Sequence, residues 1–149
     1  MDEEERRRAA RTASGFVRND EDKASGSRAR FPLTRAFGCA WSGVVYAARS
    51  QRNMKIHLVV AAAAVVLGCA LRIDGPSWAA VLVCVGSVIA AELANTAVES
   101  VVDLVSPEYH ELARRAKDCA AGAVLVLSLA AVAVACAVYL PPILAILTS

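Results

Sequence analysis

Four polar residues interrupt a long hydrophobic stretch in the second half of the sequence: Glu92, Asn95, Glu99 and Asp103. They are separated by three, four and four positions, a spacing that places all four on one face of an α-helix. Ionisable side chains in a hydrophobic helix are energetically costly, and those that occur usually face a protein interior or a wet cavity and serve a function. We therefore interpret these residues, called the acidic stripe below, as the working site.

Such residues suit the binding of a divalent cation and general-base catalysis. Mg²⁺ prefers oxygen ligands and commonly bridges protein carboxylates to substrate phosphates, so acids four positions apart suit it. A further carboxylate can act as a general base toward a hydroxyl nucleophile. Lys117 is suited to bind phosphate, and Asp118 follows it where a third hydrophobic segment begins.

The usual nucleotide and metal motifs of soluble proteins are absent from the sequence. It contains neither G-x-x-x-x-G-K-[ST] nor G-x-G-x-x-G. The five cysteines stand singly, without a C-x-x-C pair or a nearby His at metal spacing, so neither a disulfide framework nor a zinc site is expected. If the protein handles ATP, it does so by another architecture.

Charge and hydrophobicity are segregated along the chain. Hydrophobic residues make up 57% of the sequence and charged residues 20%, but twelve of the sixteen Lys and Arg precede position 56. Beyond that position Ala, Val and Leu dominate. A soluble domain intersperses charge along every element, so this segregation indicates a membrane protein.

The elements follow from the same pattern. Residues 1–30 are polar, which predicts a disordered cytoplasmic tail. Residues 31–55 carry apolar side chains at helical spacing, typical of an amphipathic helix at the membrane interface. Three segments long enough to span a bilayer follow. We therefore predict an all-α membrane domain over residues 31–149, with spans at about 56–73, 78–105 and 119–140.

Basic residues set the expected orientation. The N-terminal region is rich in Lys and Arg, and the link after the second span carries Arg114, Arg115 and Lys117. The turn between the first two spans carries only Arg72. The positive-inside rule then places the N-terminus and the second link in the cytoplasm and the C-terminus outside.

Two runs of sequence resemble a known family. Residues 91–125, AELANTAVESVVDLVSPEYHELARRAKDCAAGAVL, are similar to the signature of the small bacterial membrane kinases that phosphorylate diacylglycerol or undecaprenol: E-x-x-N-[ST]-A-[IV]-E, then D-x-x-x-x-x-Y-H, then A-K-D. Residues 37–58, FGCAWSGVVYAARSQRNMKIHL, resemble the surface helix of that family and its R-N-x-x-I-H motif. Trp78 opens the second span as in the undecaprenol-kinase branch.

The resemblance implies a homotrimer of three-helix protomers in the bacterial inner membrane, with active sites shared between neighbours. It also implies Mg²⁺-dependent transfer of the γ-phosphoryl group of ATP to the hydroxyl of a membrane lipid alcohol. Undecaprenol is the expected acceptor and diacylglycerol the alternative. The partners are thus ATP, the lipid and the bilayer, and no nucleic acid is expected.

The resemblance also implies roles for individual residues. Glu92 falls on the position of the catalytic base, with Asn95 beside it. Glu99 falls on a metal-binding glutamate that also belongs to the nucleotide site. Lys117 and Asp118 fall on the nucleotide-contacting pair.

Two positions stand apart from this assignment. Asp103 falls on a further acidic position of the same helix, without a role that the sequence defines. Gln51 stands where the family usually has a second metal-ligating glutamate, and no acid lies between Asp22 and Asp74 to replace it. A Gln carbonyl oxygen can still coordinate Mg²⁺ but brings no charge, so weaker metal binding is expected.

Two other classes of function remain open from the residues alone. A non-catalytic ion or proton pathway would require acids or His on several spans, whereas here the first span has none after His57 and the third none after Asp118. A kinase-like protein that binds nucleotide without turnover is the other alternative, for which Gln51 is the only indication.

Overall fold

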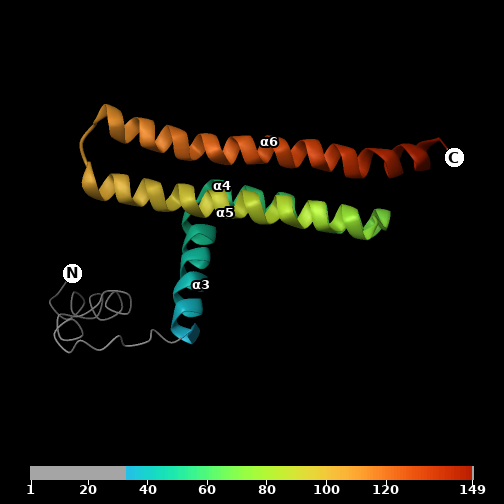
Figure 1. Ribbon diagram of the computed structural model, residues 1–149, viewed down its shortest axis with the longest axis horizontal. Helices are drawn as coiled ribbons and strands as arrows, with labels where there is room; N and C mark the ends of the chain where they lie inside the picture. Colours follow the sequence, from blue (N-terminus) through green and yellow to red (C-terminus); the bar gives the residue numbers. More distant parts are fainter. Residues whose placement is uncertain (1–32, 149) are drawn as a thin grey trace. The chain divides into compact units, whose positions relative to one another are not determined.

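The computed structural model describes residues 33–148, which form four helices (Figure 1). They are α3 (Leu33–Ser50), α4 (Arg52–Leu71), α5 (Gly75–Val105) and α6 (Glu111–Leu147). No strand occurs among these residues, which confirms the predicted all-α class. The expected cytoplasmic tail, residues 1–30, lies outside the described residues. Contacts divide the chain into two units, Met1–Gly43 and Val44–Ser149.

The amphipathic segment predicted at 31–55 is not one helix. Helix α3 ends at Ser50, whose hydroxyl donates to the carbonyl of Tyr46 at 2.7 Å. Gln51 then adopts an extended backbone (φ −95°, ψ 125°) and caps α4, which begins at Arg52. The run from Arg49 to Asn53 contains no apolar side chain, so no hydrophobic contact holds this stretch in a continuous helix. The exposed apolar side chains of α3, such as Phe37 and Trp41, suit an interfacial helix.

The predicted turn joins α4 to α5. Arg72 ends α4 in the left-handed region (φ 51°, ψ 47°), where its N–H donates to the carbonyl of Cys69 at 3.3 Å. Asp74 caps α5 by accepting a hydrogen bond from the backbone N–H of Ser77 at 2.9 Å, and Pro76 lies in the first turn. Hydrogen bonding to Ser77 lowers the pKa of the Asp74 carboxyl, so it stays ionised as a cap.

Helix α6 is longer than the span predicted at 119–140. It begins at Glu111, after an N-cap in which His110 Nδ1 accepts from the N–H of Leu112 at 3.2 Å. The polar turns before Asp118 therefore belong to the helix, because charged residues paired on its exposed face support it without a hydrophobic side. The helix also continues through Pro141 and Pro142 to Leu147, as helices in membranes often do.

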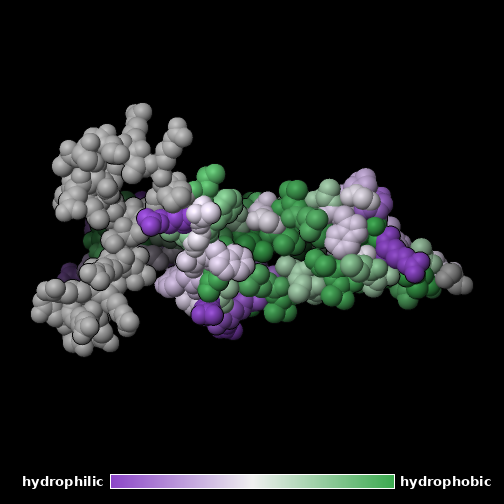
Figure 2. Space-filling model, turned by 90° about the horizontal axis from the view of Figure 1, so that it is seen from below, coloured by the Kyte–Doolittle hydropathy of each residue, from purple (hydrophilic) through white to green (hydrophobic). Residues whose placement is uncertain are grey.

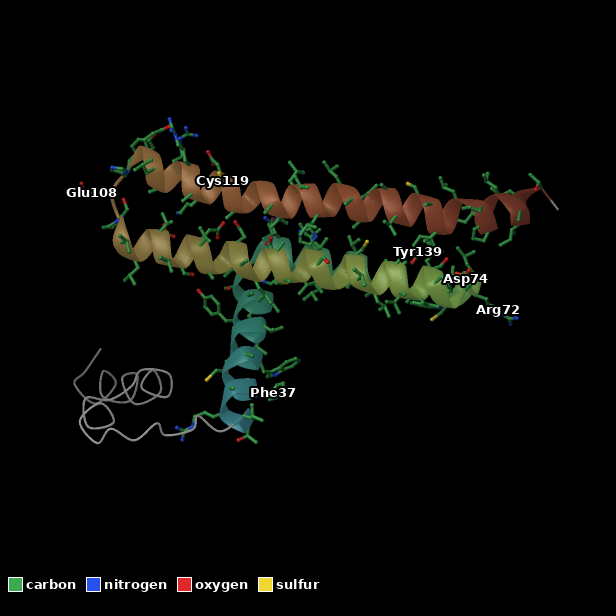
Figure 3. The ribbon with its side chains drawn as sticks, in the orientation of Figure 1. Phe37, Arg72, Asp74, Glu108, Cys119 and Tyr139 are labelled. Atoms are coloured by element: carbon green, nitrogen blue, oxygen red, sulfur yellow. The ribbon has the colours of Figure 1, made fainter. Side chains whose placement is uncertain are left out.

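Helices α5 and α6 run side by side in opposite directions, and α4 packs against both (Figure 1). Tyr139 of α6 donates a hydrogen bond to the carbonyl of Ala64 in α4 at 2.9 Å. Figure 3 places Glu108 at one end of the α5–α6 pair and Arg72 and Asp74 at the other. The two short connections therefore lie at opposite ends of the helices.

Helices α4, α5 and α6 are each long and apolar enough to cross a membrane. Their outer surfaces expose large hydrophobic side chains, among them Val66, Val83 and Leu129. Figure 2 shows hydrophobic side chains over much of the helical surface between groups of hydrophilic ones. Such a surface is stable in hydrocarbon and not in water, which agrees with three membrane-spanning helices.

Candidate active site on helix α5

The acidic stripe lies on α5 and is increasingly exposed toward the end of the helix. The side chains of Glu92 and Asn95 are buried, with only 2% and 5% of each residue exposed. Glu99 is half-buried and Asp103 is exposed. The stripe thus runs from the packed interior of the helices to the surface near Glu108.

Hydrogen bonds fix the buried part of the stripe. The side-chain amide of Asn95 donates from Nδ2 to Oε1 of Glu99 at 3.1 Å. Thr96 donates its hydroxyl proton to the backbone carbonyl of Glu92 at 2.9 Å and so does not reach the carboxylate. Because the Asn95 amide points its donor toward Glu99, its carbonyl oxygen is left facing away from that residue.

Two oxygens of the stripe lack a hydrogen-bond partner among the described residues, Oε2 of Glu92 and Oδ1 of Asn95, and both are buried. A buried polar atom without a partner costs about 1–3 kcal/mol, so each such atom calls for an explanation. Both atoms are acceptors, and their natural partners are a proton donor or a cation.

His57 of α4 adds a third titratable group to this region. The Glu92 carboxyl interacts electrostatically with His57 and with Glu99. His57 precedes the apolar part of α4 and is half-buried. The sequence motif contains His57, but only the packing of α4 against α5 reveals that it lies near Glu92.

The structure gives Asp103 a definite partner. Its Oδ1 accepts a hydrogen bond from Nζ of Lys117 at 2.5 Å, an ion pair that joins α5 to α6. Both side chains are partly exposed, so the pair contributes little to stability and fixes mainly the position of the lysine. Sequence reasoning missed this contact, because it depends on the register of α6 along α5, which the link between the two helices determines.

Asp118 is also paired. It accepts a hydrogen bond from Nη1 of Arg114 at 2.8 Å, and the same guanidinium binds Glu111 through Nη2 at 2.9 Å. Arg115 binds Glu111 as well, at 3.0 Å. These exposed pairs follow three- and four-residue helical spacing and hold the first turns of α6 together.

Gln51, the predicted neutral metal ligand, caps α4 and makes no side-chain hydrogen bond in that role. Within residues 33–148 no group of three or more His, Cys, Asp or Glu side chains is arranged to hold a metal ion. Carboxylate and amide oxygens of the stripe are nevertheless the donor types that Mg²⁺ prefers, and Oδ1 of Asn95 has no partner in the described part of the chain. The donor set therefore fits Mg²⁺.

Comparison with known proteins places the chain in a family. The sequence pattern of prokaryotic diacylglycerol kinase matches residues 38–139. A diacylglycerol kinase of Synechocystis sp. is 45% identical over 116 residues, which cover 77% of this chain and 66% of that protein.

Two further relatives are covered more fully. The undecaprenol kinase of Bacillus subtilis is 34% identical over 107 residues, 72% of this chain and 87% of that protein. The diacylglycerol kinase of Escherichia coli is 35% identical over 104 residues, 70% of this chain and 85% of that protein. The matched region contains α4, α5, most of α6 and the whole acidic stripe, and the chain belongs to the prokaryotic diacylglycerol kinase family of membrane lipid kinases.

Proposed function

We propose that the protein transfers the γ-phosphoryl group of ATP, with Mg²⁺, to the hydroxyl of a membrane lipid alcohol. The observation that carries this proposal is the buried Oε2 of Glu92, which has no hydrogen-bond partner within residues 33–148 and lies on a helix that can span the membrane. An acceptor oxygen in that place needs a proton donor, and the hydroxyl of a lipid is a donor that the bilayer supplies. Relatives named as kinases of two lipid alcohols support the same chemistry.

In this mechanism Glu92 accepts the proton of the attacking hydroxyl as general base. Asn95 orients Glu99 through its Nδ2 hydrogen bond. Glu99 would hold Mg²⁺, with Gln51 as a further neutral oxygen. The metal neutralises charge on the phosphates when it is bound.

Lys117 and Asp118 form the proposed nucleotide-binding pair. Both are ion-paired, Lys117 with Asp103 and Asp118 with Arg114. Phosphate binding by Lys117 therefore competes with Asp103. The nearby guanidinium of Arg114 adds positive charge to the surface that the nucleotide approaches.

We further propose that the protein works as a homotrimer in the bacterial inner membrane, with its N-terminus in the cytoplasm. The connection after α5 and the start of α6 then face the cytoplasm, where ATP is available. This places the exposed end of the acidic stripe and Lys117 at the same membrane face. A trimer would add oxygen ligands to a stripe that one protomer leaves incomplete.

Undecaprenol is the proposed acceptor, on the basis of the R-N-x-x-I-H motif and Trp78. Diacylglycerol is the second candidate, because the relative with 45% identity is named as a diacylglycerol kinase. The test reconstitutes the purified protein in vesicles and offers undecaprenol and dioleoylglycerol side by side with γ-labelled ATP. We expect more label in undecaprenyl phosphate than in the phosphorylated dioleoylglycerol, and we expect EDTA to abolish this labelling. Label in neither lipid would overturn the proposed function.

A further inference from the structure

A cavity of about 290 Å³ lies between α4, α5 and α6 at membrane depth. Its walls are almost entirely apolar, built by valines and alanines such as Val60, Val85 and Ala135. At this volume it is at the lower end of small-molecule sites, large enough for a segment of a lipid but not for a whole one.

The cavity lining also includes polar side chains. His57 and Ser128 are two of them, and Oγ of Ser128 is buried without a hydrogen-bond partner among the described residues. A serine in a helix usually binds the carbonyl four residues earlier, as Ser42 and Ser100 do in this protein. Ser128 instead leaves its hydroxyl available to a ligand.

The register of the two helices relates Ser128 to the proposed catalytic base. The Asp103–Lys117 ion pair fixes the register of the antiparallel helices α5 and α6. Glu92 precedes Asp103 by eleven residues, and Ser128 follows Lys117 by eleven residues. The two residues are therefore level with one another in the membrane. Val88 and Ile89, one helical turn from Glu92, line the cavity, and His57 interacts electrostatically with Glu92.

We propose that this cavity holds the carbons next to the hydroxyl of the acceptor lipid, and that Ser128 is a positioning residue that hydrogen-bonds the lipid oxygen near Glu92. The proposal rests on the function proposed above and names the class of acceptor. Tyr139 and Ser128 both carry a hydroxyl in the cavity lining. The Tyr139 hydroxyl already donates to the carbonyl of Ala64, whereas the Ser128 hydroxyl can bind a ligand. Such walls suit a single hydrocarbon chain ending in an alcohol, because ester carbonyls would find few donors.

The first test fills the cavity. Ala135→Leu adds bulk to a residue that lines it, and Ala133→Leu adds the same bulk to an exposed residue of the same helix that does not. We expect Ala135→Leu to raise the KM for a polyprenol roughly tenfold, because the added side chain takes up space that the lipid chain would fill. The KM for ATP should be unchanged. Equal effects of the two variants would overturn the proposal.

The second test removes the hydroxyl with little change of shape. Ser128→Ala should raise the KM for the polyprenol about threefold or more, with the KM for ATP unchanged, while Ser128→Thr keeps a hydroxyl and should restore the wild-type KM. A purely structural role would lower the maximal rate through loss of folded protein and leave both KM values unchanged. Unchanged lipid KM in Ser128→Ala would remove Ser128 from the site.

A binding measurement separates this inference from the proposed function. A polyprenol carrying a diazirine next to its hydroxyl is photolysed in vesicles with the wild type and with Glu92→Gln, and the labelled peptides are identified by mass spectrometry. Label on Val88 or Ile89, the cavity residues one turn from Glu92, in both proteins supports the cavity as the acceptor site, whether or not phosphate is transferred. Label elsewhere, or none, would overturn the inference even if the protein phosphorylates the lipid.

Discussion

At the scale of single residues, the burial of Glu92 and Asn95 is the feature that packing alone does not explain. Each has an oxygen without a partner in the described structure, and neither is needed to hold α5 in its helical form. A nonpolar residue would stabilise the same positions better. The unfavourable energy of these oxygens is understandable if a substrate hydroxyl and a metal ion bind them.

The pairing of Asp103 with Lys117 leads to a prediction about nucleotide affinity. If Lys117 binds the phosphates of ATP as proposed, Asp103→Asn removes the carboxylate that competes with them. An exposed ion pair is worth up to about 1 kcal/mol. We therefore expect the KM for ATP to fall by as much as about fivefold, with little change in stability. Glu108→Gln removes an exposed acid that lies outside the stripe and serves as the control. The same KM in both variants would show that Asp103 does not compete for Lys117.

Gln51 yields a second prediction, about metal affinity. If Gln51 belongs to the proposed metal site, Gln51→Glu would give that site a charged oxygen, so the Mg²⁺ concentration for half-maximal activity should fall. Gln51→Leu removes the oxygen and should raise it. The measurement is activity titrated with Mg²⁺ at constant free ATP. If neither substitution moves the midpoint, Gln51 is not part of the metal site.

At the scale of helices, the end of α4 packs tightly against the start of α5. A Cβ added to Gly68 would lie 3.0 Å from Cη2 of Trp78 and 3.1 Å from Cδ1 of Ile73. The backbone N–H of Ile73 also donates to the carbonyl of Gly68 at 3.2 Å. The turn at Arg72 is therefore fixed by contacts on both sides, and it sets how α4 lies along α5.

Gly68→Ala should consequently destabilise the protein by about 1–3 kcal/mol, the usual effect of overpacking. Gly86→Ala is the matched control, because nothing lies within 4 Å of its added Cβ and alanine favours the helix. Thermal unfolding in detergent compares the two. Adding Trp78→Phe to Gly68→Ala should recover part of the loss, and equal melting temperatures for the two alanine variants would contradict this packing.

The sequence was sufficient to predict the three spans, the turn at Asp74 and the alignment of the acidic stripe, because hydrophobicity and helical spacing are local properties. It was insufficient to predict the break at Gln51. It also missed the start of α6 at Glu111, because the polar first turns of that helix resemble a loop in sequence. The Asp103–Lys117 pair and the cavity at Ser128 depend on the register of two helices. A single serine in a hydrophobic run gives no signal of that register.

At the scale of the whole molecule, the two connections at opposite ends of the helices fit a protein that crosses the membrane three times. The turn at Arg72 and the link at Glu108 then face opposite sides (Figure 3). In the proposed function the nucleotide would reach the site from one side only, whereas the lipid alcohol would arrive from within the bilayer. This arrangement explains why the stripe is buried at Glu92 and exposed at Asp103.

Thiol labelling tests the proposed orientation. In a variant with all five native cysteines replaced, Arg72→Cys should react with a membrane-impermeant maleimide in intact spheroplasts. Glu108→Cys should react only after permeabilisation. The opposite pattern would place ATP on the wrong side of the membrane for the proposed site.

The most direct test of the account measures transfer of label from γ-labelled ATP to a lipid alcohol in vesicles by Glu92→Gln, Glu99→Gln and the control Glu108→Gln. Loss of a general base lowers rates by about 10²–10⁴-fold, so Glu92→Gln should lose nearly all transfer while still binding ATP. Glu99→Gln should require more Mg²⁺ and turn over more slowly, and Glu108→Gln should match the wild type. Full activity in both Glu92→Gln and Glu99→Gln would contradict the assignment of the acidic stripe as the active site.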